Sequence, residues 1–298
     1  MFSSSFEAFL TVQCIMMIAA LGHYLPMSMR QLDVGIAAYM ALGAYVSAIL
    51  TRDFAFAFPA ALAAGALAGA LGALFIDSLA TRVKLSGFAY AIFSLSFAES
   101  LRIILNNNNY VGGTLGFSGI EAHTTLGLVA GVLIVIVIGF WMLDRSRLGQ
   151  LRTAIADDEF IVPQFGVRLV ATKLIIFLAG GALGGLSGAM FAHYTQFVRP
   201  DDFGFELLMA IQLPVVFGGL DRFYGALLGT ALLGIIPELT RDLGQFRLLI
   251  SAVATLALLI WRPSGLLTHE TIAAVSGSFK GLLSYLRGGS RQTRPEEQ

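Results

Sequence analysis

Charged residues and cysteine are both scarce in this chain. Of its 298 residues only 13% are Asp, Glu, Lys or Arg, whereas a soluble domain carries roughly 25%. The formal net charge is zero and no long run of Lys or Arg forms a basic patch, so nucleic acid is not an expected partner. The single cysteine, Cys14, excludes a disulfide or a thiolate metal site built within one chain.

Recognisable catalytic motifs are absent as well. The sequence has no phosphate-binding Walker loop, no G-x-S-x-G and no H-E-x-x-H, and its four histidines are far apart. We therefore expect no catalytic residues, no metal and no cofactor on this chain, and we do not expect an enzyme.

Apolar residues are abundant, and they fall in long blocks. They make up 56% of the chain, and a helix needs about 20 of them to cross the hydrocarbon of a bilayer. The blocks do not alternate as barrel strands would. We predict an all-α integral membrane protein, with a membrane domain over residues 1–266 and a cytoplasmic tail over residues 267–298. Residues 1–29 contain no Lys or Arg, so we expect the first block to be a retained helix and not a signal peptide.

The blocks predict about nine transmembrane or partly re-entrant helices. Three late segments, residues 207–220, 223–237 and 248–261, are short, so each is expected to be either a broken or re-entrant helix or a tilted helix with a tight turn. Closely spaced glycines, such as Gly65, Gly69 and Gly72 and the group from Gly180 to Gly188, predict close helix packing. The segment centres are Ile18, Met40, Leu67, Phe93, Val135, Ala182, Leu213, Thr230 and Thr255.

The distribution of Lys and Arg predicts the orientation, because loops rich in these residues stay in the cytoplasm. An outside N-terminus and a cytoplasmic C-terminus give fourteen basic residues inside and five outside. The outside set is Arg52, Arg102, Arg199, Arg241 and Arg247. The inside set is Arg30, Arg82, Lys84, Arg145, Arg147, Arg152, Arg168, Lys173, Arg222, Arg262, Lys280, Arg287, Arg291 and Arg294.

Two segments carry the polar residues of most interest. Residues 144–172 form a cytoplasmic loop with an amphipathic helix of about ten residues from Gln150, which is either an ordinary connector or a docking element for a partner ATPase. Glu99 is the one acid that we place well inside an apolar segment, where it either pairs with Arg102 on the same helix or faces a pathway. The hydroxyl groups of Ser94 and Ser96 either bond back to their own helix or line that pathway.

The order of several motifs resembles one family. Residues 33–45 (DVGIAAYMALGAY), 86–99 (SGFAYAIFSLSFAE) and 112–116 (GGTLG) are followed by 146–158 (SRLGQLRTAIADD), 200–203 (PDDF), 216–220 (VFGGL), 225–229 (GALLG) and 262–266 (RPSGL). This series is similar to the LivM-type permease subunits of branched-chain (hydrophobic) amino acid ABC importers.

The resemblance implies partners and residue roles. The partners would be a related second permease, two cytoplasmic ATPases that bind ATP and Mg²⁺, and an extracytoplasmic solute-binding protein, all at the bacterial inner membrane. The implied roles are ATPase coupling for Leu148, Gly149, Arg152, Ala154, Ile155, Asp157, Asp158 and Gly166, and a solute pathway for Ser94, Ser96, Phe97, Glu99 and Gln212.

Departures from the family pattern leave the solute open. Residues 29–35 (MRQLDVG) stand where the family has G-Q-x-S-L-G-H, Ser94 replaces a threonine, and Asp158 replaces an asparagine. The same kind of importer could carry urea, a small carboxylate or an aromatic acid. A stand-alone secondary carrier is the alternative from another class, and it should have buried ion-coupling acids, for which Glu99 is the candidate in the sequence.

Overall fold

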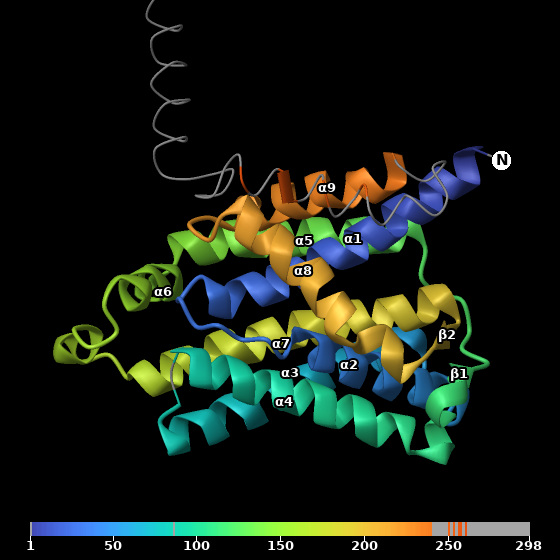
Figure 1. Cartoon of the computed structure of the whole chain (residues 1–298), viewed down its shortest axis with the longest axis horizontal. Coiled ribbons are helices and arrows are strands. Elements are labelled where there is room, and N and C mark those ends of the chain that lie inside the picture. Colours follow the sequence, from blue (N-terminus) through green and yellow to red (C-terminus); the bar gives the residue numbers. More distant parts are fainter. Residues whose placement is uncertain are drawn as a thin grey trace, which may run out of the picture.

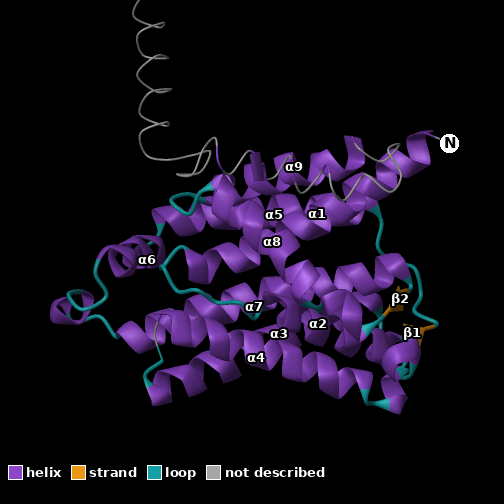
Figure 2. Ribbon diagram, viewed as in Figure 1, coloured by secondary structure: helices purple, strands orange, loops and turns teal. Residues whose placement is uncertain are grey.

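The computed structural model describes residues 2–85 and 87–239, together with positions 250, 253, 256, 257 and 260. Within this part nearly all elements are helices, and two short strands pair at one end (Figure 2). The elements are α1 (Phe2–Met27), α2 (Ile36–Arg52), α3 (Phe58–Val83), α4 (Gly87–Asn106), η1 (Asn109–Val111), η2 (Gly113–Leu115), β1 (Phe117–Ser118), α5 (Leu126–Arg145), α6 (Arg147–Asp157), η3 (Val162–Phe165), α7 (Leu169–Thr195), β2 (Phe197–Val198), η4 (Pro200–Phe203), α8 (Phe205–Gly218) and α9 (Phe223–Leu239).

The helix lengths bear out a multi-pass membrane protein but do not confirm a count of nine spans. In the described residues, five helices are long and apolar enough to cross a membrane, namely α3, α4, α5, α7 and the Ser5–Met27 part of α1. Helices α2 and α9 are shorter apolar helices. Helix α8 has only 14 residues and contains Pro214. The ninth predicted segment, the motif at 262–266 and the tail at 267–298 lie outside the described residues, apart from isolated positions.

Local sequence signals explain where several helices begin and end. Helix α3 starts with a proline in its first turn and ends where Lys84 takes a left-handed conformation with φ of 57°. The Thr125 side chain accepts a hydrogen bond from the Leu128 amide and caps α5. Helix α3 runs on to Val83, so Asp77 lies inside this helix and not in a loop.

Helix α7 is the centre of the bundle and packs against α1, α2 and α3 (Figure 1). Close approach depends on small residues, as the glycine spacing predicts. A Cβ added to Gly185 would collide with the carbonyl oxygen of Gly65 on α3, and one added to Gly43 on α2 would collide with the carbonyl of Gly185. Glycine at these positions therefore brings three helix backbones into direct contact.

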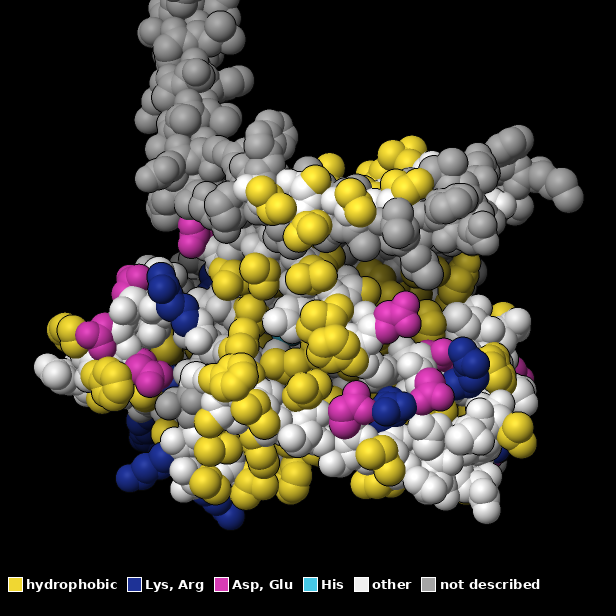
Figure 3. All heavy atoms as spheres, viewed as in Figure 1, with side chains coloured by type: hydrophobic (Ala, Val, Ile, Leu, Met, Phe, Trp, Pro, Cys, Tyr) yellow, Lys and Arg dark blue, Asp and Glu magenta, His cyan; other side chains and the backbone are white. Residues whose placement is uncertain are grey.

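Charged side chains collect toward the two ends of the bundle, and exposed hydrophobic side chains occupy much of the visible face between them (Figure 3). One end carries α6 and the turn between α3 and α4. The other end carries β1 and β2, which pair antiparallel, with Phe117 opposite Val198. At this end Arg52 lies over the ring of Phe117 at 3.6 Å and donates to the carbonyl of Ser118 at 3.2 Å. These contacts tie the long α4–α5 connection to the bundle.

Candidate functional site

The predicted docking segment contains a short amphipathic helix, α6, of 11 residues. Its N-terminus is capped by Ser146, whose Oγ accepts from the Gly149 amide at 3.3 Å. The buried face consists of Gly149, Arg152 and Ile155, which are spaced three residues apart. The helix therefore lies on the end of the bundle with one face covered and one face free.

Arg152 anchors α6 to the membrane helices. Its side chain is 5% exposed, and Nη2 lies 2.8 Å from the carboxylate of Asp144 at the end of α5. The guanidinium also lies 5.1 Å from the ring centroid of Tyr24 on α1. Gly149 permits the close turn, because a Cβ there would collide with the Leu143 carbonyl. A movement of α6 must therefore act on α1 and α5.

The structure divides the eight predicted coupling residues into two groups. Gly149, Arg152 and Ile155 are buried, and Leu148 is half-buried. Ala154, Asp157, Asp158 and Gly166 are exposed and available to a partner. A cleft of about 460 Å³ lies beside α6, and its opposite wall is formed by Asp221 and Arg222 of the α8–α9 turn.

A hydrophobic tip follows α6, and it was not among the features predicted from the sequence. Phe160, Ile161 and Phe165 are 81%, 47% and 79% exposed. The tip is ordered by Asp158, whose Oδ1 accepts from the amides of Phe160 at 2.8 Å and Ile161 at 3.3 Å. The sequence signal was present, since two phenylalanines and an isoleucine stand close together in the loop that carries most of the polar residues in the middle of the chain. We call residues 158–165 the tip.

A second interaction holds the base of the tip. Glu159 accepts from Lys173 of α7 at 2.5 Å and from Gln31 at 3.4 Å. Gln31 belongs to the connection between α1 and α2. This carboxylate therefore joins the tip to two other parts of the bundle.

The predicted solute-pathway residues on α4 face different environments. Ser94 is fully buried and donates to the carbonyl of Ala91 at 3.1 Å. Ser96 is exposed and bonds back to Ile92 at 2.7 Å. The Phe97 ring lies 6.1 Å from that of Phe75 on α3. For both serines the back-bonding alternative is therefore observed.

Glu99 pairs with Arg102 at 2.8 Å, as the intrahelical alternative predicted. Arg102 also contacts Asp201 of η4 at 2.6 Å, a partner that the sequence did not indicate. Hydrogen bonds from Asn106 and Arg102 hold the pKa of Asp201 below its usual range. These charges connect the end of α4 to the segment that leads into α8.

The interpretation of Glu99 as the one deeply placed acid is wrong. Its side chain is 34% exposed, whereas Asp33 and Asp77 are 3% and 4% exposed. Asp77 was missed because it stands directly after residues 54–76, an apolar block without charged residues. Asp33 was missed because it stands in a short connection between two blocks.

Gln212 lies on α8, which packs mainly against α9 and α1. Its Oε1 is buried and has no hydrogen-bond partner among the described residues. Of the five predicted pathway residues, four therefore lie on α4 and one on α8.

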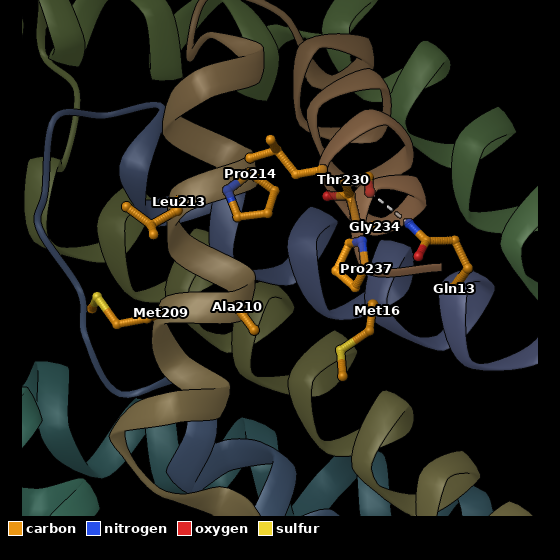
Figure 4. A pocket seen from close by; sticks show the side chains of 10 residues that line it. Gln13, Met16, Met209, Ala210, Leu213, Pro214, Thr230, Gly234 and Pro237 are labelled. Carbon is orange, nitrogen blue, oxygen red and sulfur yellow. Dashed lines mark hydrogen bonds between the residues drawn. The ribbon is translucent and has the colours of Figure 1, made fainter. Parts of the chain in front are cut away.

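An apolar pocket of about 270 Å³ lies between α1, α8 and α9 (Figure 4). Gln13 and Thr230 are the polar residues of its lining, and Gln13 Nε2 donates to the Thr230 carbonyl at 2.6 Å. Gln13 was not among the residues predicted from the sequence, although an amide inside an uncharged apolar block was a usable signal. The other lining residues are Met16, Met209, Ala210, Leu213, Pro214, Leu233, Gly234 and Pro237.

Comparison with known proteins agrees with this architecture. The family described as branched-chain amino acid transport system, permease component, matches residues 5–261. The chain is 28% identical over 287 residues to the high-affinity branched-chain amino acid transport system permease protein LivM of Salmonella typhimurium, covering 84% of this chain and 67% of that protein. LivM of Escherichia coli is also 28% identical, over 288 residues, with the same coverage.

A second group of relatives is named as permease proteins of the autoinducer 2 import system. The autoinducer 2 import system permease protein LsrC of Escherichia coli is 25% identical over 224 residues, covering 73% of this chain and 65% of that protein. No solved structure matches the chain. The family match covers most of the apolar bundle together with α6 and the tip. The chain therefore belongs to the family of branched-chain amino acid transport system permease components and is a LivM-type, multi-pass membrane permease.

Proposed function

We propose that this chain is one of two related permease subunits in an importer that moves branched-chain, hydrophobic amino acids across the bacterial inner membrane. Two cytoplasmic ATPases would dock at the α6 end and supply the energy of ATP hydrolysis. A solute-binding protein would deliver the amino acid at the end that carries β1 and β2. The N-terminus would lie outside.

The tip is the observation that carries this proposal. Phe160 and Phe165 expose large apolar side chains at a bundle end that is otherwise rich in charge. Aromatic side chains of this kind are typical anchors of protein interfaces. Helix α6 beside them is fixed to α1 and α5 through Arg152, so force applied at the tip has a path into the membrane helices.

Charge supports the same orientation. The described members of the predicted inside set include Arg82, Lys84, Arg145 and Arg147, and they lie near the end with α6. Arg52, Arg102 and Arg199 lie toward the opposite end. Labelling of introduced cysteines at Gln150 and Leu115 in intact cells tests this orientation. Outside labelling at Gln150 would overturn the ATPase docking assignment.

Copurification tests the docking proposal. We expect the double variant F160S/F165S, expressed with its ATPase and second permease subunits, to retain less than about a tenth of the ATPase, because an anchor of interface energy of about 2 kcal/mol or more is lost. The matched control is Leu115→Ser, which removes an 87% exposed apolar side chain from η2 at the other end. Equal ATPase recovery from both variants would contradict the proposal.

The solute assignment is supported by the LivM relatives and by the apolar lining beside Gln13. The LsrC relatives favour a second solute, autoinducer 2, for an importer of the same architecture. Uptake into proteoliposomes that contain the complete importer separates the two. We expect labelled leucine, isoleucine or valine to accumulate with ATP. Accumulation of autoinducer 2 alone would assign the other solute.

A stand-alone secondary carrier is favoured by one observation, the burial of Asp33 and Asp77. Buried acids are typical of ion-coupled transport. Such a carrier would transport its solute without ATPase subunits and in response to an ion gradient. We expect the purified chain alone to give no uptake under a proton or sodium gradient, and uptake under either condition would replace the importer proposal.

A further inference from the structure

The connection between α1 and α2 has an unusual position for a loop of a membrane protein. Residues 28–35, which we call the crossing segment, have no helical structure, yet Met29, Asp33, Val34 and Gly35 are buried. Non-helical backbone inside a membrane bundle is tolerated only where protein or a water-filled cavity surrounds it. The crossing segment is therefore held by specific contacts, and these can be followed from one end to the other.

The first half of the crossing segment contacts the tip through Gln31. Gln31 Nε2 donates to Glu159 Oε2 at 3.4 Å, and the same oxygen accepts from Lys173. A cleft of about 400 Å³ lies between residues 29–31 and residues 155–160. A partner that binds the tip can thus displace Glu159 and, with it, Gln31.

The second end contacts the interior of α4. The Val34 amide donates to Ser94 Oγ at 2.9 Å, and Ser94 is fully buried. Ser94 is also the residue that replaces the threonine of the family pattern, and the crossing segment is the other main departure from that pattern. Two of the three departures noted in the sequence are therefore in direct contact.

The middle of the crossing segment is fixed to α2. One oxygen of Asp33 accepts from the Gly35 amide at 2.8 Å, and the other accepts from the hydroxyl of Tyr39 at 3.2 Å. These bonds satisfy a buried carboxylate and hold the backbone in one conformation. Only two residues separate Gln31 from Val34, so a displacement of Gln31 cannot be absorbed by slack in the chain.

We infer that the crossing segment transmits the state of the docked ATPase from the tip to α4, with Gln31 and Ser94 as positioning residues. The inference rests on the proposed function. The link is a continuous series of contacts: a hydrogen bond from Gln31 to Glu159, the backbone from Gln31 to Val34, and a hydrogen bond from Val34 to Ser94. A series of contacts couples two sites only if a change at one site alters the other, and mutation tests that condition.

The experiment uses the complete importer in proteoliposomes and measures the ATPase rate with and without the solute-loaded binding protein. We expect Gln31→Ala and Ser94→Ala each to lower the ratio of stimulated to basal rate by about two- to thirtyfold, the range of coupling effects in such networks. The double variant should resemble the stronger single variant, because both residues act in one series.

Matched variants separate a lost contact from a damaged fold. Gln31→Lys keeps a donor for Glu159, and Ser94→Thr keeps the hydroxyl that accepts from Val34, so both should retain the wild-type ratio. Ser78→Ala removes a hydroxyl that, among the described residues, bonds only to the Phe75 carbonyl of its own helix, and this variant should also leave the ratio unchanged. If Ser94→Ala fails to assemble, Gln31→Ala and Gln31→Lys still decide the outcome, since Gln31 is only partly buried.

Two results would overturn the inference. One is a ratio for Gln31→Ala equal to that of Ser78→Ala. The other is a double variant whose loss equals the product of the two single losses, which would show that the residues act independently. A wild-type complex without ATPase subunits or without stimulation would instead contradict the proposed function, so the two failures are distinguishable.

Discussion

Arg152 offers a direct test of how α6 is fixed. In the variant Arg152→Ala, Asp144 loses the guanidinium at 2.8 Å while its side chain stays 12% exposed. Removal of one partner from a buried pair costs about 3–5 kcal/mol, and partial exposure of Asp144 favours the lower end. The lost contact with the Tyr24 ring adds about 0.5–1 kcal/mol. We therefore expect a loss of about 4 kcal/mol in the free energy of unfolding.

The single cysteine provides the assay. Cys14 is partly buried in α1 and reacts with a fluorogenic thiol reagent as the bundle opens. At about 2 °C per kcal/mol for a chain of this size, the apparent Tm should fall by about 8 °C. Because unfolding in detergent is often irreversible, all variants are compared at one heating rate.

Two control variants test whether the loss of stability in Arg152→Ala comes from the broken ion pair. Arg147→Ala removes an exposed arginine from the same helix and should change the apparent Tm by less than about 1 °C. The double variant D144L/R152M replaces the ion pair by apolar side chains and should recover most of the loss. A Tm for Arg152→Ala equal to that of Arg147→Ala, or a double variant below the single one, would refute the reasoning.

Further predictions concern packing and charge. Gly185→Leu should prevent folding, because any Cβ at this position collides with the Gly65 carbonyl. A Cβ at Gly139 on α5 meets no atom within 4 Å, so Gly139→Ala should be neutral or stabilising by about 0.5–1 kcal/mol. The yields of monodisperse protein from the two variants test this difference. The lowered pKa of Asp201 means that its bond to Arg102 contributes stability above the ordinary pKa of an aspartate and loses it as pH falls through the lowered value. Exchange of η4 amides should therefore rise on strong acidification, and Asp201→Asn should remove this pH dependence.

Helix positions followed from the sequence because they depend on local composition. Each predicted segment centre from Ile18 to Thr230 falls inside a described α-helix. The amphipathic helix in the polar loop was predicted for the same reason, although it begins at Arg147, three residues before the predicted start. An apolar block long enough to span a bilayer has few other stable conformations.

Contacts between distant residues did not follow from the sequence. Arg102 meets Asp201, 99 residues away, and Val34 meets Ser94, 60 residues away. Neither hydropathy nor spacing indicates which helix will lie beside which. Such contacts depend on the close packing around α7, which the glycines permit but do not specify in detail.

The position of the irregular backbone is the most informative difference between expectation and structure. The sequence predicted broken, re-entrant or tilted helices in the short late segments. Helix α8 does have only 14 residues, or about 21 Å at 1.5 Å per residue, which is less than a bilayer requires. The buried non-helical backbone of the crossing segment, however, lies at residues 28–35, between two blocks that looked like ordinary neighbouring spans. Its hydrogen bonds to Glu159 and Ser94 account for a connection that is non-helical and mostly buried, and a simple surface turn would need neither contact.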